Sequence, residues 1–316
     1  MTGTPVPLLS ARMEKQRLPV LASLMAVGAG VVWSFGAIAS RLADDADAFQ
    51  YMIWRSIGII VVVEVMAAVQ RQPFPTIRAW RSGRVMMLAN FGLFLASICF
   101  VYAVKTTTPA NAAFLGSLTP LVAVVFARFL GEKLSRSTIV ALAVGMAGLV
   151  ITVVSDLEAG SMVGNIAALT ASVGFAIYTV CLRTDTSRDW SPVLPGYGLL
   201  MVVVCGAVTI ANGKTLVPPA DDVAWALFHG SIIIVVGTIM FNAASKHVPA
   251  VPMTVFAQTE MVFVPIWGYL ILDLVPKPLT LVGGAIIFAA VVGKAWYDAA
   301  AGRRNEFTPA PDVPLL

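Results

Sequence analysis

One acidic residue in the middle of an apolar run is the position best suited to chemistry in this sequence. Glu260 lies near the centre of the run from 252 to 272, where an ionisable group costs several kcal/mol unless it faces a cavity or a partner. A carboxyl group there could take up a proton or attract a cationic amine. The alternative is a structural carboxyl, hydrogen-bonded between helices. Glu260 is therefore our first candidate for both substrate binding and proton coupling.

Two further ionisable residues, Glu64 and Arg55, lie in the run from 49 to 69. Glu64 lies roughly five residues, or about 7.5 Å of helix rise, to the cytoplasmic side of its midpoint. It is a second candidate for proton coupling, with a structural role as the favoured alternative. Arg55 is nine positions away, on the opposite helix face at about 100° per residue. We expect Arg55 to snorkel outward or to anchor backbone carbonyls.

The other candidates for substrate binding are aromatic or polar residues of the apolar runs. Trp33 stands among small residues of the first run, where its ring could stack on a substrate or a cation. Phe256, Glu260 and Trp267 share one helical face, which places the acid between two rings. His229 could relay protons or donate to a carboxylate. Weaker candidates are Asn90, Phe94, Thr119 and Tyr178, and for all of these residues packing is the alternative.

The elements that must position these residues are membrane-spanning helices. The chain has 316 residues, 58% hydrophobic and 12% charged, whereas soluble domains carry about 25% charged residues. Its apolar runs are continuous and long enough to cross a hydrocarbon layer of about 30 Å as helices, unlike the alternating strands of a membrane barrel. We predict an all-α membrane protein with spans at 18–41, 49–69, 84–104, 109–130, 136–154, 162–182, 190–211, 222–245, 252–272 and 279–297.

Charge placement predicts the orientation of these ten spans. With the N-terminus inside, sixteen basic residues fall in the inner set and four in the outer set, as expected when Lys and Arg are retained in the cytoplasm. We therefore expect an inner-membrane protein with both termini cytoplasmic, residues 1–17 forming the N-terminal segment and 302–316 a disordered tail. The net charge of +4 lies in short loops and does not indicate nucleic-acid binding. No motif indicates a cofactor or a metal.

An offset of 141 or 142 positions superimposes the second half of the chain on the first. It aligns residues 103–105 with 244–246, Glu132 with Asp273, Trp33 with Phe175, and Arg41 with Arg183. The two repeats, 18–154 and 162–298, each hold five spans, an odd number, so the second must enter the membrane from the opposite side. Inverted repeats allow two halves to rock around a site near the midplane. This pattern favours a transporter over a membrane enzyme.

Several short motifs also resemble those of a known family. They are Trp33-Ser34-Phe35-Gly36, Arg55, Ser117-Leu118-Thr119-Pro120, Gly131-Glu132-Lys133-Leu134 and Lys246-His247-Val248-Pro249-Ala250. Over nearly its whole length the chain resembles the EamA-like branch of the drug/metabolite transporter superfamily, departing from its pattern at Met261 and at Leu272-Asp273. The resemblance implies ten helices in a basket around a central cavity, lined mainly by spans 1, 3, 4, 6, 8 and 9. Such proteins move amino acids, other metabolites or drugs, commonly outward and without ATP.

These observations predict a secondary transporter that exports an amino acid or a related small metabolite by alternating access, with proton exchange through Glu260 as a possible coupling. Uptake and the export of lipophilic cationic drugs are alternatives within transport. A membrane-embedded enzyme, a lipid-handling protein and a passive channel are alternatives of other classes. No His-Asp, Ser-His-Asp or metal-ligand spacing supports an enzyme. The expected partners are a small-molecule substrate and the bilayer, and the expected state is a monomer or a homodimer.

Overall fold

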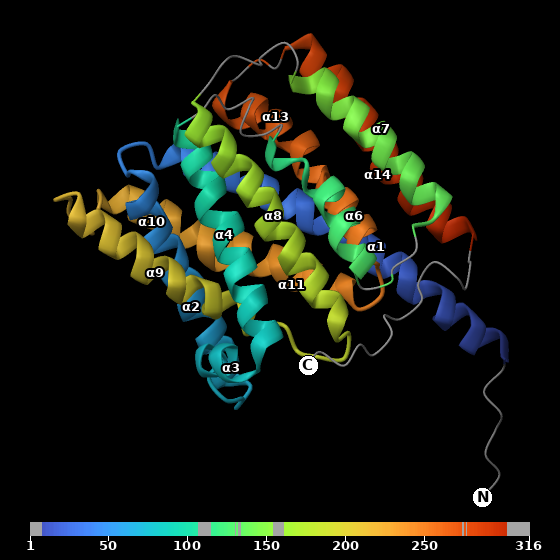
Figure 1. Cartoon of the computed structure of the whole chain (residues 1–316), viewed down its shortest axis with the longest axis horizontal. Helices are drawn as coiled ribbons and strands as arrows, with labels where there is room; N and C mark the ends of the chain where they lie inside the picture. Colours follow the sequence, from blue (N-terminus) through green and yellow to red (C-terminus); the bar gives the residue numbers. More distant parts are fainter. Residues whose placement is uncertain are drawn as a thin grey trace, which may run out of the picture.

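The fold is a bundle of helices, seen in a computed structural model that describes residues 8–106, 115–129, 131, 134–153, 161–273, 275 and 277–301. All regular structure in these residues is helical (Figure 1). Glu132 and the tail 302–316 lie outside them. The helices are α1 (Leu8–Leu42), α2 (Ala48–Val69), α3 (Pro75–Arg81), α4 (Arg84–Thr106), α6 (Thr119–Phe129), α7 (Arg136–Val153), α8 (Met162–Thr184), α9 (Val193–Ala211), α10 (Ala220–Phe228), η1 (His229–Ile234), α11 (Val235–Ser245), α12 (Ala250–Ala257), α13 (Thr259–Leu272) and α14 (Pro278–Ala301).

Among the described residues, eight stretches of helix are long and apolar enough to cross a membrane, and they match predicted spans 1 to 3 and 6 to 10. Predicted spans 4 and 5 correspond to two shorter apolar helices, Thr119–Phe129 and Arg136–Ile151. Residues 109–114 and 130 of span 4 and residue 154 of span 5 lie outside the described residues. These helices are those of a multi-pass membrane protein, and the count of ten spans stays a prediction.

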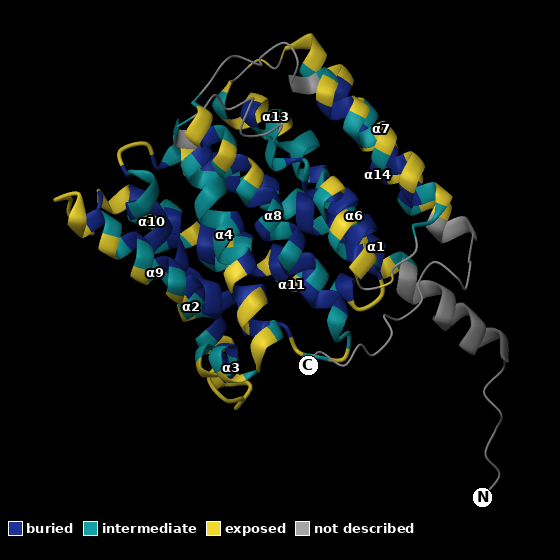
Figure 2. Cartoon of the chain, in the orientation of Figure 1, coloured by how far each residue is buried: buried dark blue, intermediate teal, exposed yellow. Residues whose placement is uncertain are grey.

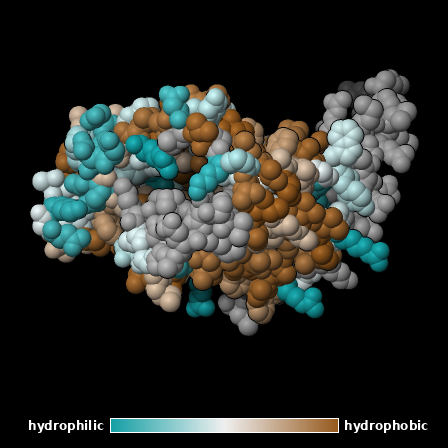
Figure 3. All heavy atoms as spheres, turned by 90° about the horizontal axis from the view of Figure 1, so that it is seen from above, coloured by the Kyte–Doolittle hydropathy of each residue, from teal (hydrophilic) through white to brown (hydrophobic). Residues whose placement is uncertain are grey.

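The outer surface of the bundle is apolar, as a bilayer requires. Large hydrophobic side chains such as Val61, Phe91 and Phe129 are exposed, and exposed residues alternate with buried ones along the rim helices α7 and α9 (Figure 2). Hydrophobic residues cover much of the face drawn in Figure 3, and hydrophilic ones gather toward one end. In a bilayer the lipid chains solvate such apolar side chains. The helices satisfy their own backbone hydrogen bonds, so no polar group needs water there.

The structure departs from the predicted spans at four places. Helix α1 begins at Leu8 rather than near 18, because Glu14, Lys15 and Arg17 are good helix formers and extend the helix past its apolar run. A short helix, α3, begins at Pro75 in the predicted loop, where proline suits a first turn. Predicted spans 8 and 9 are each interrupted, by the π-helix η1 and by a break at Gln258.

Small residues bring the central helices into backbone contact, as is common in membrane bundles. A Cβ atom added to Gly174 of α8 would lie 2.6 Å from the Gly92 oxygen and the Ala96 nitrogen of α4. At the rim, where α7 and α14 lie side by side (Figure 1), a Cβ on Gly148 would lie 2.8 Å from the Gly283 oxygen. A side chain at Gly174 or at Gly148 would therefore clash with the backbone of the neighbouring helix.

Two ion pairs lie at the two ends of α9. At its end, the Lys214 ammonium donates to the Asp47 carboxylate at the start of α2, at 2.9 Å. Just before its start, Asp189 pairs with Arg78 of α3, also at 2.9 Å. Helix α9 is therefore linked to α2 at one end and to α3 at the other.

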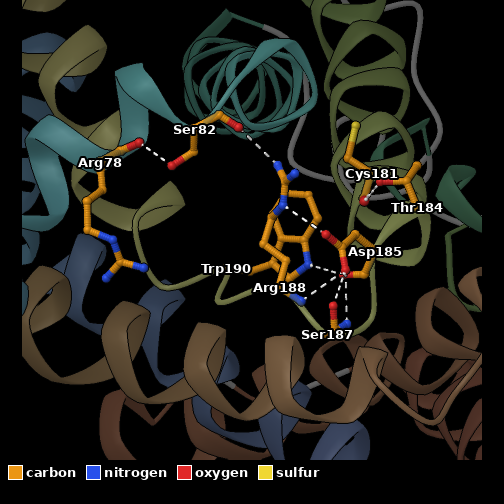
Figure 4. A network of polar contacts seen from close by, with 8 residues as sticks. All are labelled: Arg78, Ser82, Cys181, Thr184, Asp185, Ser187, Arg188 and Trp190. Carbon is orange, nitrogen blue, oxygen red and sulfur yellow. Dashed lines mark hydrogen bonds and ion pairs between the residues drawn. The ribbon is translucent and has the colours of Figure 1, made fainter. Parts of the chain in front are cut away.

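The turn between α8 and α9 is organised by Asp185 (Figure 4). Its carboxylate accepts hydrogen bonds from the Ser187 hydroxyl at 2.7 Å and from the Arg188 guanidinium at 3.3 Å. Arg188 also lies over the Trp190 ring, with 5.3 Å to the centroid, and donates to the Ser82 carbonyl at 3.1 Å. This network joins the turn to the chain between α3 and α4.

We expect Asp185→Asn to lower the free energy of unfolding by about 0.5 kcal/mol at pH 7, a value kept small by solvent screening. The bond from the Ser187 hydroxyl, with help from Arg188 and against partial burial, lowers the pKa of Asp185 below its usual value. A lowered pKa stabilises the fold above the unfolded-state value of about 3.9, and this contribution is lost as pH falls through the folded pKa. The deficit of the variant should therefore shrink at acidic pH.

Denaturant unfolding in detergent micelles, followed by circular dichroism at pH 7 and pH 3.5, checks this expectation. The exposed loop residue Asp45 gives the control, since Asp45→Asn removes the same charge without this network. An Asp185→Asn deficit equal at both pH values would contradict the proposed role of the charge.

Candidate functional site

Four aromatic side chains from three helices meet near the middle of the bundle. The Trp33 ring of α1 lies 5.8 Å from Phe175 of α8, edge to face, and 5.2 Å from Phe241 of α11. Tyr178 stacks 6.1 Å from Phe241. The structure therefore brings together two predicted site residues, Trp33 and Tyr178, in what we call the central aromatic cluster. Such rings can hold an apolar body or a cation.

The central aromatic cluster is fixed by polar contacts on one side and by close packing on the other. The Tyr178 hydroxyl donates to the Asn242 side-chain oxygen, and the Asn242 amide donates to the Trp190 carbonyl at 3.4 Å. A Cβ atom on Gly237 of α11 would lie 2.5 Å from Cδ1 of the Trp33 ring. Sequence reasoning missed Phe241 and Asn242, although both lie in span 8, which the resemblance assigns to the cavity.

Glu260 lies at a helix break, in the first turn of α13. The break is at Gln258, whose amide donates to the Ser117 carbonyl at 3.2 Å. Helix α1 packs on this break, since a Cβ on Gly30 would lie 3.2 Å from the Glu260 backbone nitrogen. A helix N-terminus favours a negative charge. Within the described part of the chain the Glu260 carboxylate has no hydrogen-bond or ion-pair partner, which leaves it available to a ligand or a proton.

The break also changes the expected arrangement of Phe256 and Trp267. Phe256 lies in α12, before the break, and is fully buried. The helical periodicity that would put Phe256 on one face with Glu260 and Trp267 is interrupted at Gln258. Trp267 instead contacts α1: its indole donates to the Ser34 hydroxyl at 2.9 Å, and its ring stacks on Phe35 at 4.4 Å.

A small apolar cavity lies beside the break. It measures about 10 Å³ and is lined by residues of α6, α7, α12 and α14 together with Gln258. A volume of this size is about enough for one water molecule. An organic substrate could enter this cavity only if the surrounding helices separate.

His229 is the first residue of the π-helix, and its side chain contacts both α1 and α2. Its Nδ1 shares a hydrogen bond of 2.8 Å with the Tyr51 hydroxyl of α2. On the other side, a Cβ on Gly36 of α1 would lie 2.5 Å from its Nε2. Single π-helical turns are frequent at functional sites, and here the turn places an imidazole between two helices.

Four other predicted residues lie in packed or locally bonded positions. Asn90 donates to the Ala79 carbonyl of α3 at 3.1 Å. Phe94 packs in the apolar cluster between α2 and α9. Thr119 donates to the Gly116 carbonyl at 2.9 Å, and Glu64 accepts bonds of 2.7 and 2.5 Å from the backbone and hydroxyl of Thr76 in α3. The described contacts do not join these four to the central aromatic cluster, and their binding or coupling roles stay predictions.

The expectation that Arg55 snorkels outward is wrong. Its side chain is buried, with the residue only 5% exposed, and its guanidinium donates to the Ser97 hydroxyl of α4. Helix η1 packs on the backbone of α2 at this point, since a Cβ atom on Gly230 would overlap the Arg55 carbonyl. Arg55 is thus a charged interior residue whose position sequence reasoning misjudged.

Comparison with known proteins places this arrangement in a family. The model of the EamA-like transporter family matches residues 20–154 and again 162–294. The pseudopaline exporter CntI of Pseudomonas aeruginosa is 26% identical over 277 residues, covering 85% of this chain and 94% of its own. An uncharacterized transporter of Archaeoglobus fulgidus is 24% identical over 229 residues, covering 72% of this chain and 81% of its own.

A solved crystal structure of a protein has the same fold. It superposes with a TM-score of 0.74 at 20% identity, covering 90% of this chain and 99% of that one. Because the family model matches most of the chain in two successive segments, and the relatives are transporters, this multi-pass membrane protein belongs to the EamA-like transporter family.

Proposed function

We propose that this protein is a secondary transporter that exports a small organic metabolite across the cell inner membrane by alternating access. Family membership supports transport, and the similarity to an exporter supports the outward direction. In this proposal the ten spans form two inverted repeats with both termini cytoplasmic. The substrate is an amino acid or a related compound, and it is exported in exchange for protons that Glu260 binds and releases.

The observation that carries the proposal is contact between residues that the repeat pairs. Trp33 and Phe175, 142 positions apart, lie 5.8 Å from each other. Ser117 and Gln258, 141 positions apart, are joined by a hydrogen bond. Residues related by a two-fold axis touch only where they lie on that axis. The two contacts therefore support an axis between the halves, where an inverted-repeat transporter binds its substrate.

The position of Glu260 supports its role in binding or coupling. It lies in a broken helix near these axis contacts, as substrate and ion sites do in transporters with discontinuous helices. The Ser117–Gln258 bond joins the break to the turn before α6. It therefore connects the two halves of the chain directly beside Glu260. Glu64, by contrast, holds the start of α3, which supports a structural role for that carboxylate.

Transport in membrane vesicles of both orientations tests the function. Right-side-out and inside-out vesicles would be loaded with a panel of amino acids and related metabolites, with and without a pH gradient. We expect wild-type protein to move at least one compound in the outward direction and to respond to the gradient. Movement in the uptake direction alone would exclude export, and no movement under any gradient or exchange would exclude the transporter proposal.

A further inference from the structure

The buried Arg55 carries a positive charge and has hydrogen-bond donors that are not used. In the residues that the structure describes, no carboxylate forms an ion pair with it. A guanidinium has five N–H donors, yet its one described hydrogen bond goes to the Ser97 hydroxyl. The Nε atom is sealed from solvent and has no partner. An isolated charge at this depth is costly, so such residues usually have a partner in the working cycle.

Ser97 places this charge at the inner side of α4. One face of α4, with Gly92 and Ala96, packs on Gly174 of α8, and another face, with Ile98 and Val101, packs on the cluster between α2 and α9. At helical spacing Ser97 falls between these faces, on the stripe of Leu93 and Phe100. Leu93 contacts both apolar clusters of the interior, and Phe100 contacts Gly116 ahead of α6. The guanidinium therefore reaches the interior of the bundle.

None of the described groups around Arg55 forms an ion pair with it. Tyr51, Tyr197 and His229 lie within electrostatic reach of the guanidinium, but none of them is a standing anion at neutral pH. Asp222, the acidic residue on this side of α10, is also buried. Its carboxylate is already bound by the Ala46 backbone N–H at 2.6 Å. Asp222 forms no ion pair with Arg55 among the described contacts, so the unused guanidinium donors are open to an anionic group from outside the protein.

We propose that Arg55 binds a carboxylate group of the transported compound, an inference that rests on the proposed function. A planar guanidinium matches a carboxylate with two parallel hydrogen bonds. One guanidinium balances one negative charge, so a carboxylate fits better than a phosphate dianion. Glu260, on a different helix, remains available for an amino group. This assigns small amino-carboxylates as the substrate class, with Arg55 as the site of the carboxylate group.

Paired probes that differ only in the carboxylate test this assignment. Purified protein in proteoliposomes would be assayed with a panel of free L-amino acids and with the C-terminal amide of each one. We expect wild-type protein to prefer the acid of any transported pair by at least about tenfold, as for a charge-assisted contact. Arg55→Gln should raise KM for the acid by a similar factor and leave KM for the amide unchanged. Arg55→Lys should give a KM for the acid between those of wild type and Arg55→Gln.

A matched control is Arg128→Gln, at an exposed position of α6, which should keep the wild-type preference for acids. Elution from a sizing column reports whether each variant folds, and the wild-type preference for acids tests the proposal without any variant. Equal transport of amides and acids, or an unchanged KM in folded Arg55→Gln, overturns the role of Arg55 while leaving transport established. No transport of any panel compound overturns the proposed function and this assignment together.

Discussion

Glu260→Gln is expected to lower the rate of substrate movement about a hundredfold and to remove its response to a pH gradient. The carboxylate lies in the first turn of α13 with no partner among the described residues, so it is available for a substrate amine or a proton. Glutamine keeps the size of the side chain but can neither carry charge nor exchange a proton. Loss of one charge-assisted contact of about 3 kcal/mol corresponds to about a hundredfold.

The same helix offers a control for this substitution. Asp273 is exposed at the end of α13 in a left-handed conformation with φ of 53°, which asparagine tolerates well. Asp273→Asn should therefore keep both the rate and the pH response in proteoliposomes with an imposed gradient. If Glu260→Gln retains wild-type transport and pH dependence, the central role of Glu260 is wrong.

The helical architecture could be predicted from hydropathy because the bilayer imposes one strong rule. Every spanning segment must be apolar outside and must satisfy its own backbone, so continuous runs such as 84–104 reveal α4 directly. The similarity between the two halves of the sequence also pointed to residues that are close in space. Trp33 and Phe175, which the offset aligns, are in contact. Neither result needed knowledge of how particular side chains pack.

The details that shape the site depend on tertiary contacts and could not be predicted in the same way. The break at Gln258 is stabilised by a bond to Ser117 on a distant segment. The π-helix at His229 coincides with close packing of Gly230 on Arg55. Arg55 is buried with its guanidinium on Ser97 of α4, whereas a long basic side chain considered alone is expected to reach the membrane surface. Each feature involves residues far apart in the sequence, which periodicity within one helix does not report.

Close packing between α4 and α8 predicts the largest effect on stability. Gly174→Ala is expected to lower the free energy of unfolding by about 3 kcal/mol, the upper range for overpacking. The added Cβ would lie 2.6 Å from the Gly92 oxygen and from the Ala96 nitrogen. Both are backbone atoms of α4, so no side-chain rotation can relieve the clash, and the two helices must move apart.

Gly206→Ala in α9 isolates the effect of this contact from the general effect of adding a methyl group to a helix. A Cβ there meets nothing within 4 Å, so alanine should stabilise α9 by about 0.5–1 kcal/mol through its better helix propensity. The two variants therefore have opposite predicted signs although the substitution is the same. Denaturant unfolding in detergent micelles measures both, and a Gly174→Ala variant as stable as wild type would show that α4 and α8 do not meet backbone to backbone at this point.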